Sequence, residues 1–451
     1  MKILAIESSC DETAAAVVEN GTQILSNVVV SQVDIFAAYG GVIPEVAARS
    51  HLEVILPVVH KALDDAKLTK DDIDAIAVTH TPGLLGSLLI GTLTARVLAI
   101  LWDKPLYAVH HLKSHIYANW LLPCTTTQPS SSPATRSSSG LSLQAEASSS
   151  SPRVDKSSSL STGCGMVAGE DEYLMLVQGQ SVFADVCRER LKEQPAGCEE
   201  RDTREDGLSN GSLEVNVSKD DTSVPEFPLL ALVVSGGHTQ IIYMSGHNQF
   251  EIIGTTRDDA VGECFDKVAK ILGLPYPGGP SIAKAALQGD AKKYKLPHPQ
   301  VDGLNFSFSG LKTAVLRAVQ AECGLPITTP SYELKEHLSE QQKADFAASF
   351  QETACEILME KVKIALRGHQ KVKSLVIAGG VSANAVLRQK AVESLQKAFQ
   401  GKIKVYFPDL EFAGDNAAMV GAAAYFEVVS GVKPTDPYTL SIAPRTAISE
   451  N

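Results

Sequence analysis

Two stretches of the chain share one pattern of apolar and polar residues. Residues 3–18 form an apolar run, a short polar turn and a second apolar run, and residues 229–243 repeat that order. Apolar runs separated by a turn of small or polar residues predict a strand, a tight turn and an antiparallel strand. The repetition favours two similar lobes that face each other across a cleft.

Apolar residues at helical spacing follow each copy of this pattern. They predict helices over residues 42–63, 86–101 and 341–366. Strands that alternate with helices indicate the α/β class. We expect residues 1–122 to form a first lobe, completed by the C-terminal segment 416–451, and residues 227–415 to form a second lobe.

The segment between the expected lobes, residues 123–226, has a different composition. It contains runs of serine, such as 130–132 and 148–151, and acidic stretches such as 199–202. Such a segment offers too little apolar surface to offset the entropy lost on ordering. We expect a mostly disordered insertion, in which residues 173–191 are apolar enough to form a transient helix or a docking element.

Bulk composition limits the classes of protein further. The chain has 451 residues, 44% of them hydrophobic, and a net charge of −12. Most of that negative charge falls in the expected insertion, so the rest is only mildly acidic and a nucleic-acid substrate is not excluded. The eight cysteines include no C-x-x-C pair, which argues against a disulfide framework and a zinc ribbon.

The first residues and the apolar runs predict the location. The chain opens directly on a strand-like run, and no stretch approaches eighteen uninterrupted apolar residues. We therefore expect a cytoplasmic protein that does not enter a membrane.

Two histidines and a distant aspartate form a candidate metal site. His111 and His115 are four residues apart, so on a helix their imidazoles project from one face. Asp415 precedes an apolar run at 417–425 that predicts a helix, and it could complete a triad that leaves positions open for water or substrate. Taken alone, the histidine pair could also be a surface feature, and Asp415 could be a helix N-cap.

Two glycine-rich turns are candidate anion sites. Ser235-Gly236-Gly237 follows the first strand of the second copy, and residues 374–384 run from a buried strand through Gly379-Gly380 toward a helix that begins near Asn384. Glycine lets a ligand approach the backbone closely, and free backbone N–H groups at such turns bind phosphate.

A series of further motifs follows in unbroken order along the chain. They are residues 6–13, 40–49, the His111/His115 helix, 234–239, 262–267, 276–280, 306–313, 379–384 and 415–419. Together they resemble one family, the TsaD family of bacterial and organellar tRNA N6-adenosine threonylcarbamoyltransferases, formerly called O-sialoglycoprotein endopeptidases. The resemblance covers nearly all of residues 1–122 and 227–445. It implies a two-lobed actin/sugar-kinase/heat-shock-ATPase-like fold with duplicated lobes and a central cleft.

The resemblance also implies a reaction. Members transfer the threonylcarbamoyl group of threonylcarbamoyl-adenylate to N6 of adenosine 37, giving t6A in tRNAs that read codons beginning with A. The implied metal ligands are His111, His115 and Asp415, and the ion is ferrous iron or zinc. The implied donor-binding residues are Val233, Val234, Ser235, Gly236, Gly237, Asp266, Gly279 and Asn384.

Further roles follow from the same motifs. Asp11 and Glu12 are expected to orient the attacking amine or to assist its deprotonation, although acidic residues in a turn are also common turn formers. Bacterial relatives act with a TsaB-like paralogue and a TsaE-like ATPase, whereas a homodimer suffices in organellar relatives. A partner helix is expected to pack near residues 45–63.

The sequence departs from the family pattern at several positions. Ser114 stands between the ligand histidines where a glycine is frequent, and Ala413-Gly414 precede Asp415 where relatives often carry Cys-Thr. None of these changes removes a ligand. The insertion is the largest departure, and it is expected to emerge near the cleft.

Three other functions remain open from the sequence. A metallopeptidase would need a general base, and residues 111–115 lack the glutamate of H-E-x-x-H proteases. A kinase or ATPase would share the fold but would not need the triad. An inactive scaffold would not need to keep every implied ligand.

Overall fold

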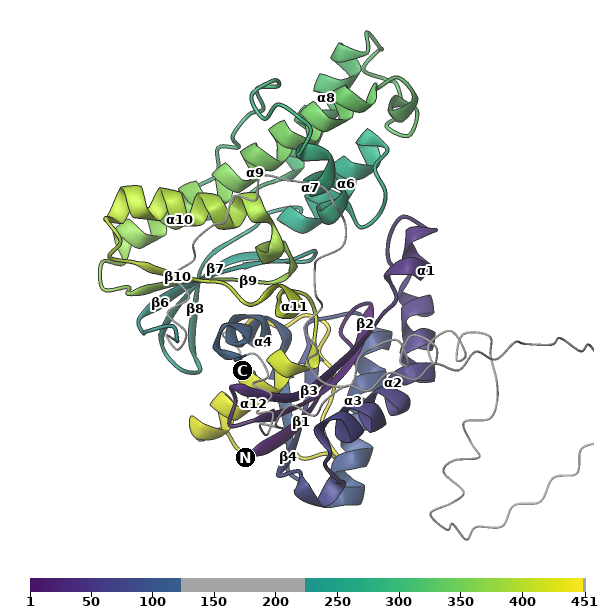
Figure 1. The fold of residues 1–451 in the computed structure, drawn as a ribbon, viewed down its shortest axis with the longest axis vertical. Coiled ribbons are helices and arrows are strands. Elements are labelled where there is room, and N and C mark those ends of the chain that lie inside the picture. The colour runs from purple at the N-terminus through teal and green to yellow at the C-terminus, as the bar shows by residue number, and fades with distance from the viewer. Residues whose placement is uncertain (123–223, 449–451) are drawn as a thin grey trace, which may run out of the picture. The chain divides into compact units, whose positions relative to one another are not determined.

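The computed structural model describes residues 1–122 and 224–448. Nearly all of the expected insertion, including residues 173–191, lies outside the described residues. The described chain contains two five-stranded sheets (Figure 1).

The first sheet has the strand order β3-β2-β1-β4-β5. Its strands are β1 (Lys2–Glu7), β2 (Glu12–Glu19), β3 (Gln23–Ser31), β4 (Ala75–Thr81) and β5 (Leu106–His110). β1 pairs antiparallel with β2 and parallel with β4, while β2 pairs antiparallel with β3 and β4 pairs parallel with β5.

The second sheet repeats this plan in the order β8-β7-β6-β9-β10. Its strands are β6 (Leu229–Val234), β7 (Thr239–Gly246), β8 (Gln249–Thr255), β9 (Ser374–Ala378) and β10 (Lys404–Tyr406). The pairing directions match the first sheet strand for strand. This duplication confirms the predicted α/β class and the actin/sugar-kinase/heat-shock-ATPase-like fold.

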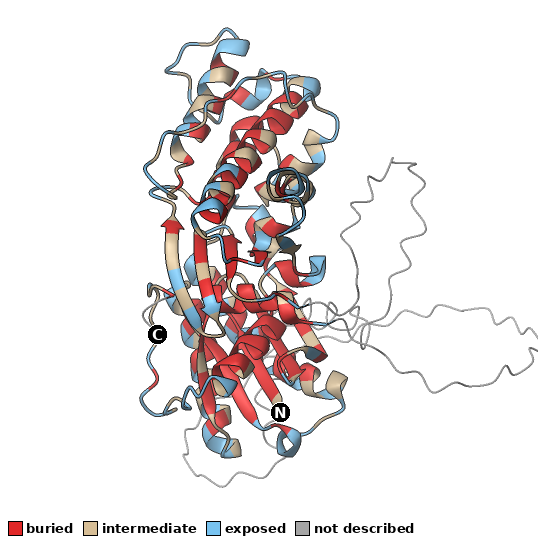
Figure 2. Cartoon of the chain, turned by 90° about the vertical axis from the view of Figure 1, so that its left-hand side faces the viewer, coloured by how far each residue is buried: buried red, intermediate tan, exposed pale blue. Residues whose placement is uncertain are grey.

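Both central strands are apolar because both of their faces are covered. Every residue of β6 is buried, as are all but the first residue of β1, and Figure 2 shows the strands largely in the colour of buried residues. Continuous apolar runs are typical of strands packed on two faces. In β3, buried residues alternate with more exposed ones, as expected for a strand at the edge of the first sheet.

Helices surround each sheet. Those of the first half are α1 (Val33–Ala37), α2 (Pro44–Ala66), α3 (Leu85–Trp102) and α4 (His111–Tyr117). Those of the second half are α6 (Val261–Leu272), α7 (Gly278–Ala286), α8 (Ser309–Glu322), α9 (Glu340–Gly368), α10 (Ala385–Phe399), α11 (Leu410–Ala413) and α12 (Ala417–Val429). The three helices predicted from apolar spacing correspond to α2, α3 and α9 and are confirmed.

α12 packs on the first sheet although it lies near the C-terminus of the chain. At Gly421 a Cβ atom would come within 2.8 Å of the Val18 side chain, so only glycine permits this close approach. Thr435 also forms a bridge with Leu106 of β5. The segment from α12 onward therefore contributes to the core around the first sheet.

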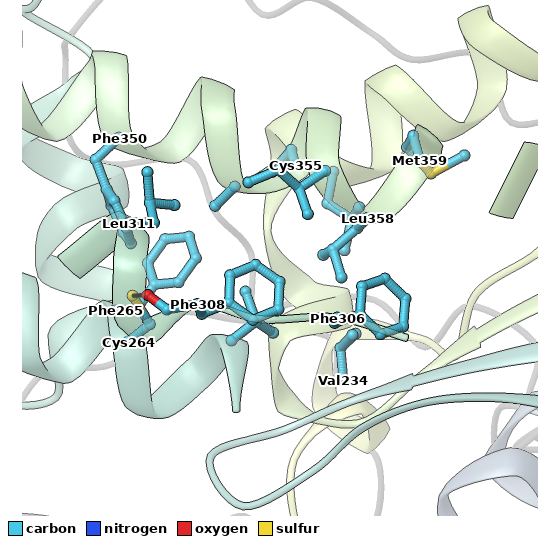
Figure 3. Close-up of a cluster of buried hydrophobic side chains, with 14 of the residues drawn as sticks. Val234, Cys264, Phe265, Phe306, Phe308, Leu311, Phe350, Cys355, Leu358 and Met359 are labelled. Atoms are coloured by element: carbon cyan, nitrogen blue, oxygen red, sulfur yellow. Dashed lines mark hydrogen bonds between the residues drawn. The ribbon is translucent and has the colours of Figure 1, made fainter. Parts of the chain in front are cut away.

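The second sheet is covered by a core that joins α6, α8 and α9. Figure 3 shows the aromatic rings of Phe265, Phe306 and Phe308 packed beneath α9, which contributes Phe350 and Leu358. All five side chains are buried, and such apolar burial is the main stabilising contribution to folding.

α3 has an unusual surface. It is the one helix among the described residues that is long and apolar enough to cross a membrane, and 39% of it is buried in the fold. Length and composition alone are weak evidence for a membrane span, because the core helices of other folds share them. Its exposed apolar residues Leu85, Leu89, Leu93 and Val97 recur every four residues, so they form one stripe along the helix.

Candidate metal centre and active site

The three predicted metal ligands come together at the ends of two helices. His111 is the first residue of α4, which begins where β5 ends, and His115 lies one turn further. Asp415 stands just before α12. The side chain of Asn416, not that of Asp415, caps this helix by accepting a hydrogen bond from the Met419 backbone N–H at 3.0 Å. The alternative of Asp415 as the helix N-cap is therefore wrong.

The ligand atoms form a compact triangle. Nε2 of His111 lies 3.1 Å from Nε2 of His115, and Oδ1 of Asp415 lies 3.5 Å from the first and 3.1 Å from the second. Atoms bound to one ion at about 2.0–2.2 Å are separated by roughly these distances. Both histidines are buried and Asp415 is partly buried. The cluster therefore fits a divalent metal ion.

The charged groups of the triangle shift one another's pKa values. Burial would lower the pKa of His111, but the carboxylates of Asp415 and Glu7 raise it to about 9. Burial would raise the pKa of Asp415, but His111 and His115 hold it below its usual range. Burial and the charge of His111 lower the pKa of His115.

Glu7 is a functional residue to which the sequence assigned no role. It ends β1, is fully buried, and places Oε2 3.3 Å from Nδ1 of His111. The hydroxyl of Thr79 donates to the same oxygen, and the backbone N–H of Ser9 donates to Oε1, each at 2.6 Å. This carboxylate orients His111 so that Nε2 faces the other ligands. An acidic residue directly after the apolar run 3–6 was the available signal.

Asp11 ends the turn between β1 and β2, and Glu12 is the first residue of β2. The hydroxyl of Ser31 donates to Oε1 of Glu12 at 3.1 Å. Burial, followed by the charges of Asp11 and Asp415, raises the pKa of Glu12 well above its ordinary value. Glu12 therefore lies within electrostatic range of both Asp11 and the predicted metal ligand Asp415.

The turn after β6 presents its backbone to solvent. Gly236 and Gly237 are exposed, and a Cβ added at either would meet nothing within 4 Å. Ser235 is partly buried, whereas Val233 and Val234 are fully buried in the sheet. The glycines are therefore accessible to a ligand, and the valines hold the turn in place.

Asp266 and Gly279 belong to neighbouring helices, α6 and α7. Oδ1 of Asp266 accepts a hydrogen bond from the Gly278 backbone N–H at 2.7 Å, which fixes the carboxylate and leaves Oδ2 available. Burial raises the pKa of Asp266, and the charge of Asp11 adds to that effect. A Cβ at Gly279 would meet no atom within 4 Å, so this backbone is open to close approach.

Asn384 is the N-cap of α10. Its Oδ1 accepts from the Leu387 backbone N–H at 3.1 Å, and its Nδ2 donates to Gln351 at 2.8 Å. The capping role confirms the predicted helix start and leaves part of the amide for a ligand.

His238 lies beside the metal centre on the turn that leads into β7. Burial and the charges of His111 and His115 lower its pKa to about 4, so the imidazole is neutral at neutral pH. The family motif at 234–239 contained this residue, but no role was predicted for it.

Comparison with known proteins identifies the family. A family model described as TsaD, tRNA N6-adenosine threonylcarbamoyltransferase, matches residues 23–139 and 211–422. Relatives with that name from Symbiobacterium thermophilum and Thermomicrobium roseum are 40% and 38% identical over 432 and 443 residues, each covering 96% of this chain and 93% of the relative. A solved structure, the activator of the 2-hydroxyisocaproyl-CoA dehydratase from Clostridium difficile, aligns with 95% of this chain and 96% of its own at 11% identity and a TM-score of 0.40. The family model and the relatives show that the chain belongs to the TsaD family of tRNA N6-adenosine threonylcarbamoyltransferases.

Proposed function

We propose that this chain transfers the threonylcarbamoyl group of threonylcarbamoyl-adenylate to N6 of adenosine 37 in tRNAs that read codons beginning with A. Threonylcarbamoyl transfer to a tRNA adenosine is the activity of its family. The amine nitrogen attacks the carbamoyl carbon, the bond from that carbon to the phosphate oxygen breaks, AMP leaves, and the amine loses one proton. The observation that carries this proposal is the triangle of His111, His115 and Asp415 in a chain that matches the family.

The triad would hold one divalent ion, which when bound supplies a Lewis acid for the donor. Two imidazoles and one carboxylate suit ferrous iron or zinc. Glu7 keeps the proton of His111 on Nδ1, so that Nε2 is free to bind.

The remaining site residues bind the donor and accept the proton. The exposed backbone at Gly236, Gly237 and Gly279 admits the phosphate and the flat base, and the free Oδ2 of Asp266 accepts from ribose hydroxyls. Glu12, whose pKa is raised, is suited to take the proton from the amine, which Asp11 helps to orient.

Partners are proposed to bind the apolar stripe of α3 together with Leu52 and Leu56 of α2. These two helices pack against each other, and Leu52 is 66% exposed. A partner helix would bury this surface. We assign the surface to a TsaB-like paralogue, with a second copy of this chain as the organellar form and a TsaE-like ATPase as a further component.

We also propose a cytoplasmic location. A tRNA substrate and the free cysteines of the described residues, Cys10, Cys264, Cys323 and Cys355, suit a reducing compartment.

The test is mass spectrometry of nucleosides from tRNA incubated with the protein, threonylcarbamoyl-adenylate and the bacterial partners. We expect t6A with the native protein and none with the double variant His111→Ala/His115→Ala. Peptide cleavage and ATP turnover are measured in parallel, because they report the alternative functions. The proposal is abandoned if metal-loaded protein forms no t6A even after residues 124–226 are deleted.

A further inference from the structure

A second pocket adjoins the metal centre and has no assigned ligand. It is an open depression of about 540 Å³, lined by the loop after β4, the C-terminal tail and His238. Sites for small ligands commonly enclose about 300–1,000 Å³. None of the proposed donor-binding residues lines it.

Hydrogen bonds connect one wall of this pocket to the predicted metal ligand His111 and the other wall to its neighbour His110. The Leu84 backbone N–H donates to the Ser9 carbonyl at 2.8 Å, and the Ser9 hydroxyl lies 3.2 Å from Nδ1 of His111. On the other wall, Nε2 of His110 donates to the Thr446 carbonyl at 3.0 Å. The backbone N–H of Gly83 donates to the Pro444 carbonyl at 3.3 Å and joins the two walls.

The chemistry of the lining selects a nucleotide. Pro82, Leu84 and Pro444 provide apolar surface against which a flat base can pack. Arg445 is exposed, and no carboxylate in the described part of the chain forms an ion pair with it, so its guanidinium is available for a phosphate. Among the described residues, no acidic side chain lines this pocket, whereas Asp11, Glu12 and Asp266 gather near the proposed donor site.

We propose that this pocket receives the acceptor nucleotide of the RNA, with the adenine between the proline-bearing walls and Arg445 on a flanking phosphate. The inference rests on the proposed function and names the place of its second substrate. A base in a tRNA loop can leave its stack to enter such a pocket, where His238 contacts its edge beside the metal centre.

Kinetics with the complete protein and its partners test the pocket. We expect Arg445→Ala to raise the KM for tRNA about 10-fold or more, since it removes a phosphate contact, while kcat and the KM for threonylcarbamoyl-adenylate stay unchanged. Ala447→Phe, which fills the pocket, should also raise the KM for tRNA. Lys433→Ala removes a positive charge from the same C-terminal segment outside the pocket and should change neither KM. A rise in the donor KM instead would assign the pocket to the adenylate and overturn the proposal.

A binding experiment keeps this proposal separate from the reaction. An anticodon stem-loop RNA carrying 2-aminopurine at position 37 is titrated with protein, and its fluorescence reports unstacking of the base. We expect the fluorescence to rise with the native protein and with Lys433→Ala, and to rise much less with Arg445→Ala and Ala447→Phe. Equal responses from all four proteins would overturn the pocket proposal, whereas absent t6A with a normal fluorescence rise would overturn the proposed function alone.

Discussion

At the scale of single residues, Glu7 has the clearest consequence for the metal centre. Its carboxylate holds Nδ1 of His111, so Glu7→Gln keeps the shape but loses the charge that supports ligation. We expect the affinity for Zn²⁺ to fall by about 10–100-fold, the usual effect of losing such a partner. Competition with a chelator measures it, and Glu19→Gln at the far end of β2 is the matched control. An unchanged affinity in Glu7→Gln would show that His111 is held by other contacts.

The charge on His111 predicts how metal binding depends on pH. In the metal-free protein the pKa of His111 is raised to about 9 by Asp415 and Glu7, so the ring is protonated at neutral pH. An ion binds only the neutral form, so affinity should increase with pH until about pH 9, and each ion bound at pH 7 should release about one proton. Calorimetry in buffers with different ionisation enthalpies counts that proton. Affinity that stays constant from pH 6 to pH 8 would contradict the assignment.

Sequence patterns predicted the candidate metal ligands but not the residues that support them. His111 and His115 are recognisable because four-residue spacing reports a shared helix face, and the motifs paired them with Asp415. Glu7, Thr79 and His110 act through contacts between distant segments, which spacing along the chain does not report. The burial of Val233 and Val234 likewise depends on contacts between distant segments, because β6 lies between β7 and β9 in the sheet.

At the scale of elements, the α3 stripe should govern assembly. Replacing Leu89 with glutamate places a charge in the proposed partner surface, at a side chain that is 43% exposed in the isolated chain. We expect Leu89→Glu to weaken association at least about 10-fold, since burying an unpaired charge is costly. Light scattering coupled to size exclusion measures the complex. Leu287→Glu, at an exposed residue directly after α7, is the control and should leave association intact. Retained assembly in both variants would exclude this surface.

The elements were the most predictable part of the structure. Both strand–turn–strand units and the helices α2, α3 and α9 follow from local periodicity, because apolar residues face the core at the period of each element. The stripe on α3 was not foreseen, since apolar residues on a helix predict burial without saying whether the cover is this chain or a partner.

At the scale of the whole described chain, a buried ion pair joins the two sheets through α4. Lys113 lies 3.5 Å from Glu427 of α12 and 3.4 Å from Oδ1 of Asn248, at the tip of the β7–β8 hairpin. The Lys113 and Glu427 side chains are 3% and 6% exposed. Burial raises the pKa of Glu427, which Lys113 partly offsets.

Breaking this pair should therefore destabilise the fold. We expect Lys113→Met to lower the free energy of unfolding by about 3 kcal/mol, because it leaves a buried carboxylate without its partner. The double variant Lys113→Met/Glu427→Leu should recover most of the loss. Urea denaturation of the two single variants and the double variant gives the coupling energy, and purely additive losses would mean that the ions do not interact.

Around the same junction, Trp120 and Phe227 stack with ring centroids 6.0 Å apart. These residues flank the segment 123–223, so a contact within the described structure holds the two ends of that segment close together. The entropic cost of closing a chain between two fixed points grows slowly, by about 0.6 kcal/mol for each doubling of length. Segments of very different length can therefore be exchanged here at little cost to stability, and the junction is a natural place to graft a reporter domain whose own termini lie close together.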